Sequence, residues 1–120
     1  MSSEGLHAPR ERLSPEALAL HHAIVSLIEE LDAVDWYRQR ADDTEDAALR
    51  GILLHNMREE MEHASMLLEW VRRNNADFAG HLRTYLFSEA PILEVEAAAE
   101  AGPAAAPPRR GFTVGPLKGE

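Results

Sequence analysis

Apolar residues recur along the first third of the chain with the period of an α-helix. They follow one another at alternating spacings of four and three residues: Leu20, Ile24, Leu27, Leu31 and Val34. Ser14 followed by Pro15 is typical of the residues that open a helix. The pattern fades near Arg40, so we expect a first helix of about seven turns.

A second apolar pattern follows a short polar stretch. Residues 41–46 supply turn and capping groups, and we expect the next helix to run from about Glu45 to Arg73. Its apolar face is broad and contains Leu49, Ile52, Leu53, Met57, Met61, Ala64, Leu67, Leu68 and Val71. Because the loop is short, the two helices should form an antiparallel hairpin, which makes the fold class all-α.

The rest of the chain divides by composition. Residues 1–13 have no periodic pattern and are expected to be disordered, whereas residues 14–91 form the hairpin domain. That domain should end with a short third helix over residues 76–87, which Pro91 interrupts. Residues 92–110 are rich in alanine and proline and are expected to form a flexible linker.

The terminal residues 111–120 place three apolar side chains, Phe112, Val114 and Leu117, in a polar tail. This arrangement is typical of a peptide ligand, although an end of the chain without a role is the alternative.

Charge and composition restrict the function. Acidic residues outnumber basic ones by 21 to 12, and the net charge of -9 argues against nucleic acid and favours cations as ligands. The chain contains no cysteine, so a metal would be held by oxygen and imidazole. We expect a cytoplasmic protein, because no long apolar run and no signal-peptide pattern is present. A hairpin of this size should also bury its apolar face against other copies.

One acid lies on the apolar face of each predicted helix. At about 100° per residue, Glu60 falls in the middle of the apolar arc of the second helix, and His63 lies one turn further on. A carboxylate in a core must be protonated, ion-paired or metal-bound. The Glu-x-x-His spacing favours a metal. Glu30 has a similar position on the first helix, offset from Glu60 by about 6 Å along the axis.

These residues form half of a known kind of site. A ferritin-like di-iron bundle takes one glutamate from each of two helices and a Glu-x-x-His motif from each of the other two. Two hairpins related by a two-fold axis would supply Glu30, Glu60 and His63 twice. We therefore expect dimerisation into a ferritin-like four-helix bundle. Carboxylates with one imidazole per ion suit iron or manganese, and zinc is also possible; we predict iron.

Neighbouring residues are less specific. Glu29, Asp32 and Trp36 share another side of the first helix, which forms either a solvated acidic face or a secondary site where cations enter. Tyr37 could hydrogen-bond to a ligand or act as a redox-active ring, and simple packing is the alternative.

Three segments resemble the encapsulated ferritins. They are residues 28–37 (IEELDAVDWY), 59–64 (EEMEHA) and 81–87 (HLRTYLF). The resemblance extends over residues 14–91 and the terminal peptide. It implies dimers of two-helix subunits in a ring-shaped decamer, with a ferroxidase centre at the dimer interface.

The resemblance also implies roles for single residues. Glu30, Glu60 and His63 correspond to the iron ligands and Tyr37 to the tyrosine beside them. Glu29 and Asp32 correspond to the secondary site, where relatives commonly have glutamate in place of Asp32.

The end of the chain resembles the peptide that docks cargo inside an encapsulin shell. Residues 113–117 (TVGPL) carry this likeness, with Pro116 in place of the more usual serine. The implied function is oxidation of Fe(II) by dioxygen, with the mineral stored inside an encapsulin nanocompartment that binds residues 111–118. Two other functions remain open: a non-catalytic metal-binding oligomerisation module, and a metal-free helical adaptor.

Overall fold

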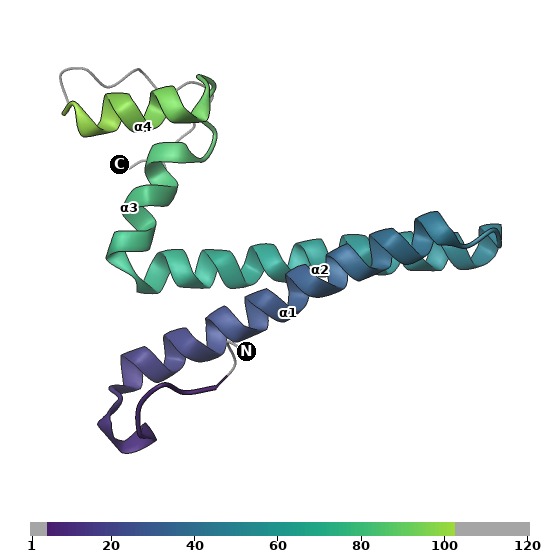
Figure 1. The fold of residues 1–120 in the computed structure, drawn as a ribbon, viewed down its shortest axis with the longest axis horizontal. Helices are drawn as coiled ribbons and strands as arrows, with labels where there is room; N and C mark the ends of the chain where they lie inside the picture. Colours follow the sequence, from purple (N-terminus) through teal and green to yellow (C-terminus); the bar gives the residue numbers. More distant parts are fainter. Residues whose placement is uncertain (1–4, 103–120) are drawn as a thin grey trace. The chain divides into compact units, whose positions relative to one another are not determined.

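The computed structural model describes residues 5–102, and in that range every regular element is helical (Figure 1). The elements are a 3-10 turn η1 (Arg10–Arg12) and four α-helices, α1 (Pro15–Asp43), α2 (Ala47–Asn74), α3 (Ala76–Tyr85) and α4 (Ile92–Glu100). The predicted all-α fold class is confirmed. The expectation of a disordered start was wrong at η1, where the amide of Leu13 donates to the carbonyl of Arg10 and closes a turn.

The two long helices begin and end at capping groups. The hydroxyl of Ser14 accepts a hydrogen bond of 3.0 Å from the amide of Ala17, so α1 starts where the sequence predicted. It continues three residues beyond Arg40 and ends at Asp43. The start of α2 at Ala47 is two residues later than predicted, because Asp46 accepts a hydrogen bond of 3.1 Å from the amide of Leu49.

The helices α1 and α2 lie side by side in opposite directions, joined by the short loop of residues 44–46 (Figure 1). Their shared core is made of small side chains: Ala23, Ala41, Ala64 and Val71 are the buried residues of the two helices. The predicted antiparallel hairpin is therefore present, but it has a thin core.

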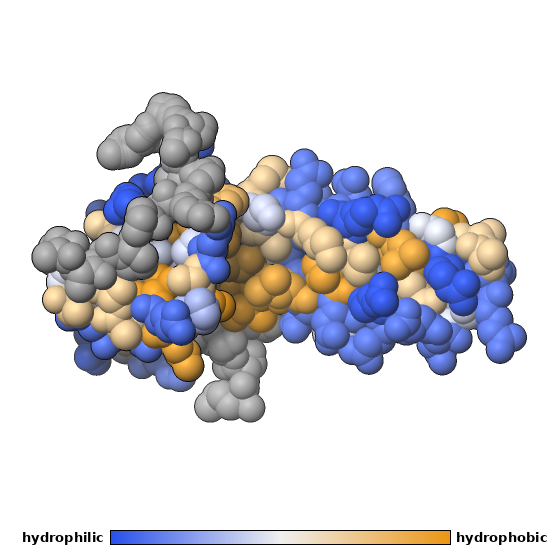
Figure 2. Space-filling model, turned by 90° about the horizontal axis from the view of Figure 1, so that it is seen from above, coloured by the Kyte–Doolittle hydropathy of each residue, from blue (hydrophilic) through white to orange (hydrophobic). Residues whose placement is uncertain are grey.

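Much of the apolar surface of the hairpin stays in contact with water. Leu31 is 54% exposed, Ile52 58% and Met66 57%. The hairpin carries, on the face seen in Figure 2, a band of hydrophobic residues with hydrophilic residues along its edges. Apolar surface of this extent is typical of a chain that associates with a partner.

The second compact unit follows Asn74 and contains α3 and α4. The side chain of Asn75 caps α3 by accepting a hydrogen bond of 2.8 Å from the amide of Phe78. The helix ends at Tyr85, two residues earlier than predicted, and Phe87 adopts a left-handed backbone conformation with φ of 64°. This conformation is uncommon for a bulky residue and turns the chain out of the helix.

The prediction of a flexible linker from residue 92 was wrong for residues 92–100, which form α4. Pro91 precedes the helix, Val95 is 4% exposed, and α4 contacts α3. Alanine has the highest helix propensity, and the nearest following proline is Pro103. The remainder of the predicted linker and the terminal peptide lie outside the described residues. Within the described part, no helix is long and apolar enough to cross a membrane.

Candidate metal site

Three side chains converge halfway along the hairpin. Glu30 comes from α1, whereas Glu60 and His63 come from α2. One ligand atom from each residue can be chosen so that all three lie within 4.8 Å of one another. Among residues 5–102 this is the only group of three or more acids and histidines close enough to share an ion. The structure thus brings together the three residues that the sequence predicted as metal ligands, and their binding of a metal stays a prediction.

The two glutamates stand at the same height in the hairpin. Glu30 lies 13 residues before the end of α1 at Asp43, and Glu60 lies 13 residues after the start of α2 at Ala47. The predicted axial offset of about 6 Å was therefore wrong. The error in the offset came from the helix ends. The apolar pattern fades before α1 ends at Asp43, and α2 begins only after Asp46, which caps it.

The cluster is held by polar contacts between its members. Nδ1 of His63 lies 3.2 Å from a carboxylate oxygen of Glu60 and 3.6 Å from one of Glu30. The side chains of Glu30 and Glu60 are 27% and 24% exposed, and that of His63 is 42% exposed. The acids were expected inside the core, but in a single chain they lie at its open edge.

Contacts within the cluster shift the pKa values of all three residues. The hydrogen bond between the two carboxyl groups raises the pKa of Glu30, and partial burial and the charge of Glu60 act in the same direction. The same hydrogen bond and the contact with His63 lower the pKa of Glu60. In turn, the hydrogen bond to Glu60 raises the pKa of His63 above 6.5. Protons therefore balance negative charge at a place where a cation could do the same.

The donor set fits a divalent cation. Carboxylate oxygens and an imidazole nitrogen bind such ions at about 2.0–2.2 Å, so ligands of one ion lie at most about 4.4 Å apart. The observed separation of up to 4.8 Å needs only a small rotation of the side chains. Three ligands from one chain would leave the exposed side of such an ion open.

Tyr37 lies two turns beyond Glu30 on α1 and is half-buried. The guanidinium carbon of Arg40 lies 5.7 Å from the centre of its ring, a cation–π distance. Tyr37 offers no atom to the three-residue cluster, and its role stays a prediction.

The residues of the predicted secondary site lie on the surface of α1. Glu29 and Asp32 are exposed, and Trp36 is 51% exposed. Trp36 also lines a shallow pocket of about 230 Å³ with Gln39 and Arg40. No further acid or histidine of the described residues joins Glu29 and Asp32 in a group of three, so this site also stays a prediction.

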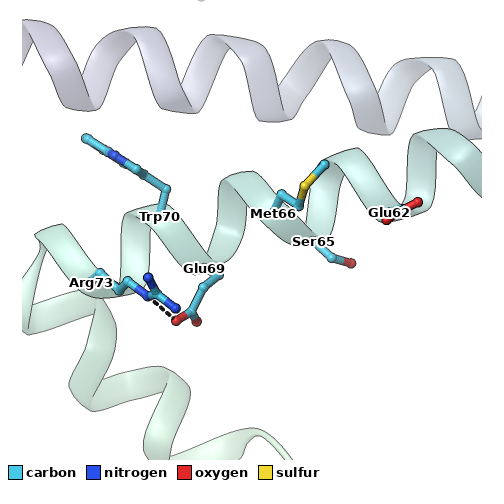
Figure 3. Close-up of a pocket in the computed structure, with 6 residues that line it drawn as sticks. All are labelled: Glu62, Ser65, Met66, Glu69, Trp70 and Arg73. Atoms are coloured by element: carbon cyan, nitrogen blue, oxygen red, sulfur yellow. Dashed lines mark hydrogen bonds and ion pairs between the residues drawn. The ribbon is translucent and has the colours of Figure 1, made fainter.

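A second surface hollow was not expected from the sequence. It has a volume of about 420 Å³, and all of its lining side chains come from α2: Glu62, Ser65, Met66, Glu69, Trp70 and Arg73. Figure 3 shows Arg73 turned toward Glu69, where their charged groups are 2.6 Å apart. The spacing of Met66 and Trp70 on one side of the helix is a signal that sequence analysis could have used.

Comparisons with known proteins agree with this fold. The profile of the EncFtn-like family matches residues 5–89. An encapsulated ferritin-like protein of Rhodospirillum rubrum is 57% identical over 101 residues, which span 84% of this chain and 72% of that protein. The encapsulin nanocompartment cargo protein EncC of Myxococcus xanthus is 33% identical over 99 residues, 74% of this chain and 76% of its own.

A solved structure is also similar to this chain. The crystal structure of protein ne0167 from Nitrosomonas europaea has a TM-score of 0.71 and 50% sequence identity, and the match covers 73% of this chain and 97% of that one. The chain belongs to the EncFtn-like family. The resemblance to the encapsulated ferritins is thereby confirmed.

Proposed function

We propose that the chain is a ferroxidase, which oxidises Fe(II) to Fe(III) with dioxygen at a di-iron centre shared between two copies. The observation that carries this proposal is the convergence of Glu30, Glu60 and His63 at one height of the hairpin. Membership of the EncFtn-like family and the ferritin-like names of its relatives agree with it.

The proposal that two copies share the centre rests on the ligand positions and the apolar surface that a single hairpin leaves exposed. Three ligands hold one side of an ion, and His63 keeps 42% of its side chain exposed. Apolar side chains on the same two helices, such as Leu31 and Ile52, are also more than half exposed. A second hairpin placed by a two-fold axis would cover this surface and add the same three ligands for a second iron ion. Assembly of such dimers into a ring-shaped decamer is part of the proposal.

The residues have separate tasks in this reaction. Glu30 and Glu60 bind the substrate iron through hard oxygen ligands and neutralise the charge that grows when Fe(II) becomes Fe(III). His63 binds through a ring nitrogen and must be neutral to do so. Each iron ion gives one electron to dioxygen. We propose Tyr37 as a group near the centre and Glu29, Asp32 and Trp36 as a secondary site where iron enters.

We further propose that the protein works inside an encapsulin nanocompartment in the cytoplasm. One relative is named an encapsulin nanocompartment cargo protein, and another an encapsulated ferritin-like protein. Residues 111–118 would bind the shell protein, and the Fe(III) would be stored as mineral in the shell. The hairpin has too little interior to hold a mineral itself, because its buried residues are three alanines and a valine.

A non-catalytic metal-binding oligomerisation module is the second candidate. The observation that favours it is the position of the three-residue cluster on an exposed apolar surface, where an ion could hold two copies together without turnover. This protein would assemble on addition of iron but would take up no dioxygen.

The kinetics of Fe(II) oxidation in air separate the two candidates. We expect the wild-type protein to form Fe(III) rapidly, whereas Glu60→Ala and His63→Ala should oxidise iron no faster than buffer does. Glu62→Ala is the matched control, because Glu62 is an exposed acid of the same helix outside the cluster. Wild-type rates in both cluster variants would contradict the site, and slow oxidation by an iron-bound wild-type protein would favour the second candidate.

A further inference from the structure

Arg50 joins the two sides of the hairpin loop. Its half-buried side chain reaches from the first turn of α2 back to α1, where Nε donates a hydrogen bond of 2.9 Å to the carbonyl oxygen of Ala41. A second nitrogen of the same guanidinium donates to the carbonyl oxygen of Thr44, the residue that caps α1. Both carbonyl groups lie at the C-terminal end of α1. The last carbonyl groups of a helix have no hydrogen-bond partner within the helix.

The geometry of this contact restricts both the position and the rotation of α1. A guanidinium is planar and presents its donors in a fixed fork, so two bonds to carbonyls three residues apart fix its orientation. Ala41 is 1% exposed, which limits competition from water for the backbone at this point. On the other side of the loop, the side chain of Asp46 caps α2, and the backbone carbonyl of Asp46 accepts a hydrogen bond of 2.9 Å from the amide of Arg50.

The fully buried core of the hairpin offers little else to fix the register of the helices. Its buried residues are Ala23, Ala41, Ala64 and Val71, and small side chains interdigitate less than large ones. A slip of one residue would move Glu30 by about 1.5 Å along the axis and turn it by about 100°. The geometry of the three-residue cluster depends on this register, because Glu30 is its only member from α1.

We propose that Arg50 is a positioning residue that sets the height of Glu30 against Glu60 and His63. Ala41 follows Glu30 by 11 residues and Arg50 precedes Glu60 by 10, so the contact lies almost equally far from both carboxylates. The consequence for metal binding rests on the proposed function. The effect on helix register does not.

The experiment measures register and metal binding separately. The chain has no cysteine, so spin labels can be attached through cysteines introduced at Asp35 and His55. Both residues are exposed, and each lies eight residues from the hairpin end of its helix, between the loop and the cluster. Distances are measured in the metal-free full chain, diluted with unlabelled protein so that only pairs within one chain contribute.

The variants are Arg50→Met, which keeps the aliphatic stem, and Arg50→Lys, which keeps one donor group. Arg38→Met is the matched control, because Arg38 forms an exposed ion pair with Asp42 of 3.7 Å near the same end of α1. Unlabelled forms of the same variants are titrated with Co(II), whose visible spectrum reports the geometry of its ligands.

We expect Arg50→Met to broaden the distance distribution, change the Co(II) spectrum and lower Co(II) affinity by about tenfold, the lower end of losses at supporting residues of metal sites. Arg50→Lys should recover part of both effects, and Arg38→Met should match the wild type. An unchanged distribution in Arg50→Met would overturn the proposal, as would a broadened distribution with wild-type affinity and spectrum. If the wild type binds no Co(II), the proposed function fails, and the distances alone decide whether Arg50 fixes the register.

Discussion

His63 and Glu60, one turn apart on α2, are joined by a contact of 3.2 Å between Nδ1 and a carboxylate oxygen. The contact raises the pKa of His63 above its ordinary value of 6.5. It therefore favours the protonated imidazole in the metal-free protein, although a metal ligand must be neutral. Proton and metal ion compete for this side chain, and the competition leads to the first prediction.

Metal affinity should rise with pH through the raised pKa of His63 and level off above it. Below that pKa each metal ion must displace a proton, so Co(II) affinity should change by about tenfold per pH unit. The raised pKa of Glu30 adds further proton release at lower pH. Titrations with Co(II) at a series of pH values measure this dependence.

Glu60→Gln provides a check on the cause of that dependence. The variant removes the charge that favours protonated His63, so the plateau of Co(II) affinity should begin at a lower pH while the affinity itself falls. An affinity that is independent of pH in the wild type around the ordinary histidine pKa would contradict the assignment of His63 as a ligand.

A separate acid-sensitive contact lies near the end of α2. Hydrogen bonds from Arg72 and Arg73 lower the pKa of Glu69 to about 2. Because the folded-state pKa is depressed, the stabilisation is present above the ordinary value of 4.5 and is lost as the pH falls toward 2. Glu69→Gln should therefore lower the Tm near neutral pH and should have no effect near pH 2.

The size of that effect should be small. The side chains of Glu69 and Arg72 are 40% and 41% exposed, and exposed ion pairs contribute up to about 1 kcal/mol each. We expect a Tm difference of about 4–8 °C, the shift that a loss of about 1 kcal/mol causes in a small domain. Thermal unfolding followed by circular dichroism measures it, with Glu62→Gln as the control. A difference that persists unchanged at pH 2 would contradict the contact.

Self-association should depend on the exposed apolar surface of the hairpin. Ile52 is 58% exposed and lies two turns before Glu60 on α2. A charge at this position would be buried without a partner when a second copy covers it, so Ile52→Lys should lower the oligomer mass while helix content is kept. Sedimentation of Ile52→Lys and of the control Glu62→Lys measures the change. A wild-type protein that remains monomeric with metal present would contradict the shared centre.

The secondary site on α1 can be tested through its dependence on iron concentration. If Glu29 and Asp32 gather iron for the centre, Glu29→Gln combined with Asp32→Asn should slow oxidation when Fe(II) is scarce. The rate at saturating Fe(II) should stay the same, because Glu30, Glu60 and His63 are intact. An equal loss at both concentrations would place these acids in the reaction itself, and no loss at either would show that they form a solvated face.

The sequence predicted the hairpin and the convergence of Glu30, Glu60 and His63, because both depend on helical periodicity. Glu30 and Glu60 could be placed on the apolar faces of their helices from residue spacing alone, and His63 followed from its position one turn after Glu60. Their equal height was not predictable, because it depends on helix ends that capping by Asp46 determines.

Other features could not be predicted from the sequence, for different reasons. The composition of residues 97–99 predicts a linker, yet alanine favours a helix once Val95 can pack. The exposure of Glu30 and Glu60 depends on what covers the hairpin, and periodicity cannot distinguish a face buried within one chain from a face buried by a partner. The role of Arg50 has no signal in the sequence, because its contacts cross a loop that has no periodic pattern.

The most direct test of the shared centre is a crystal structure of the iron-loaded protein with anomalous diffraction at the iron edge. We predict two neighbouring iron ions between two copies, each bound by glutamate oxygens and by one His63, with Glu30 and Glu60 of both copies around the pair. Iron bound within a single hairpin, or no iron at His63, would contradict the account.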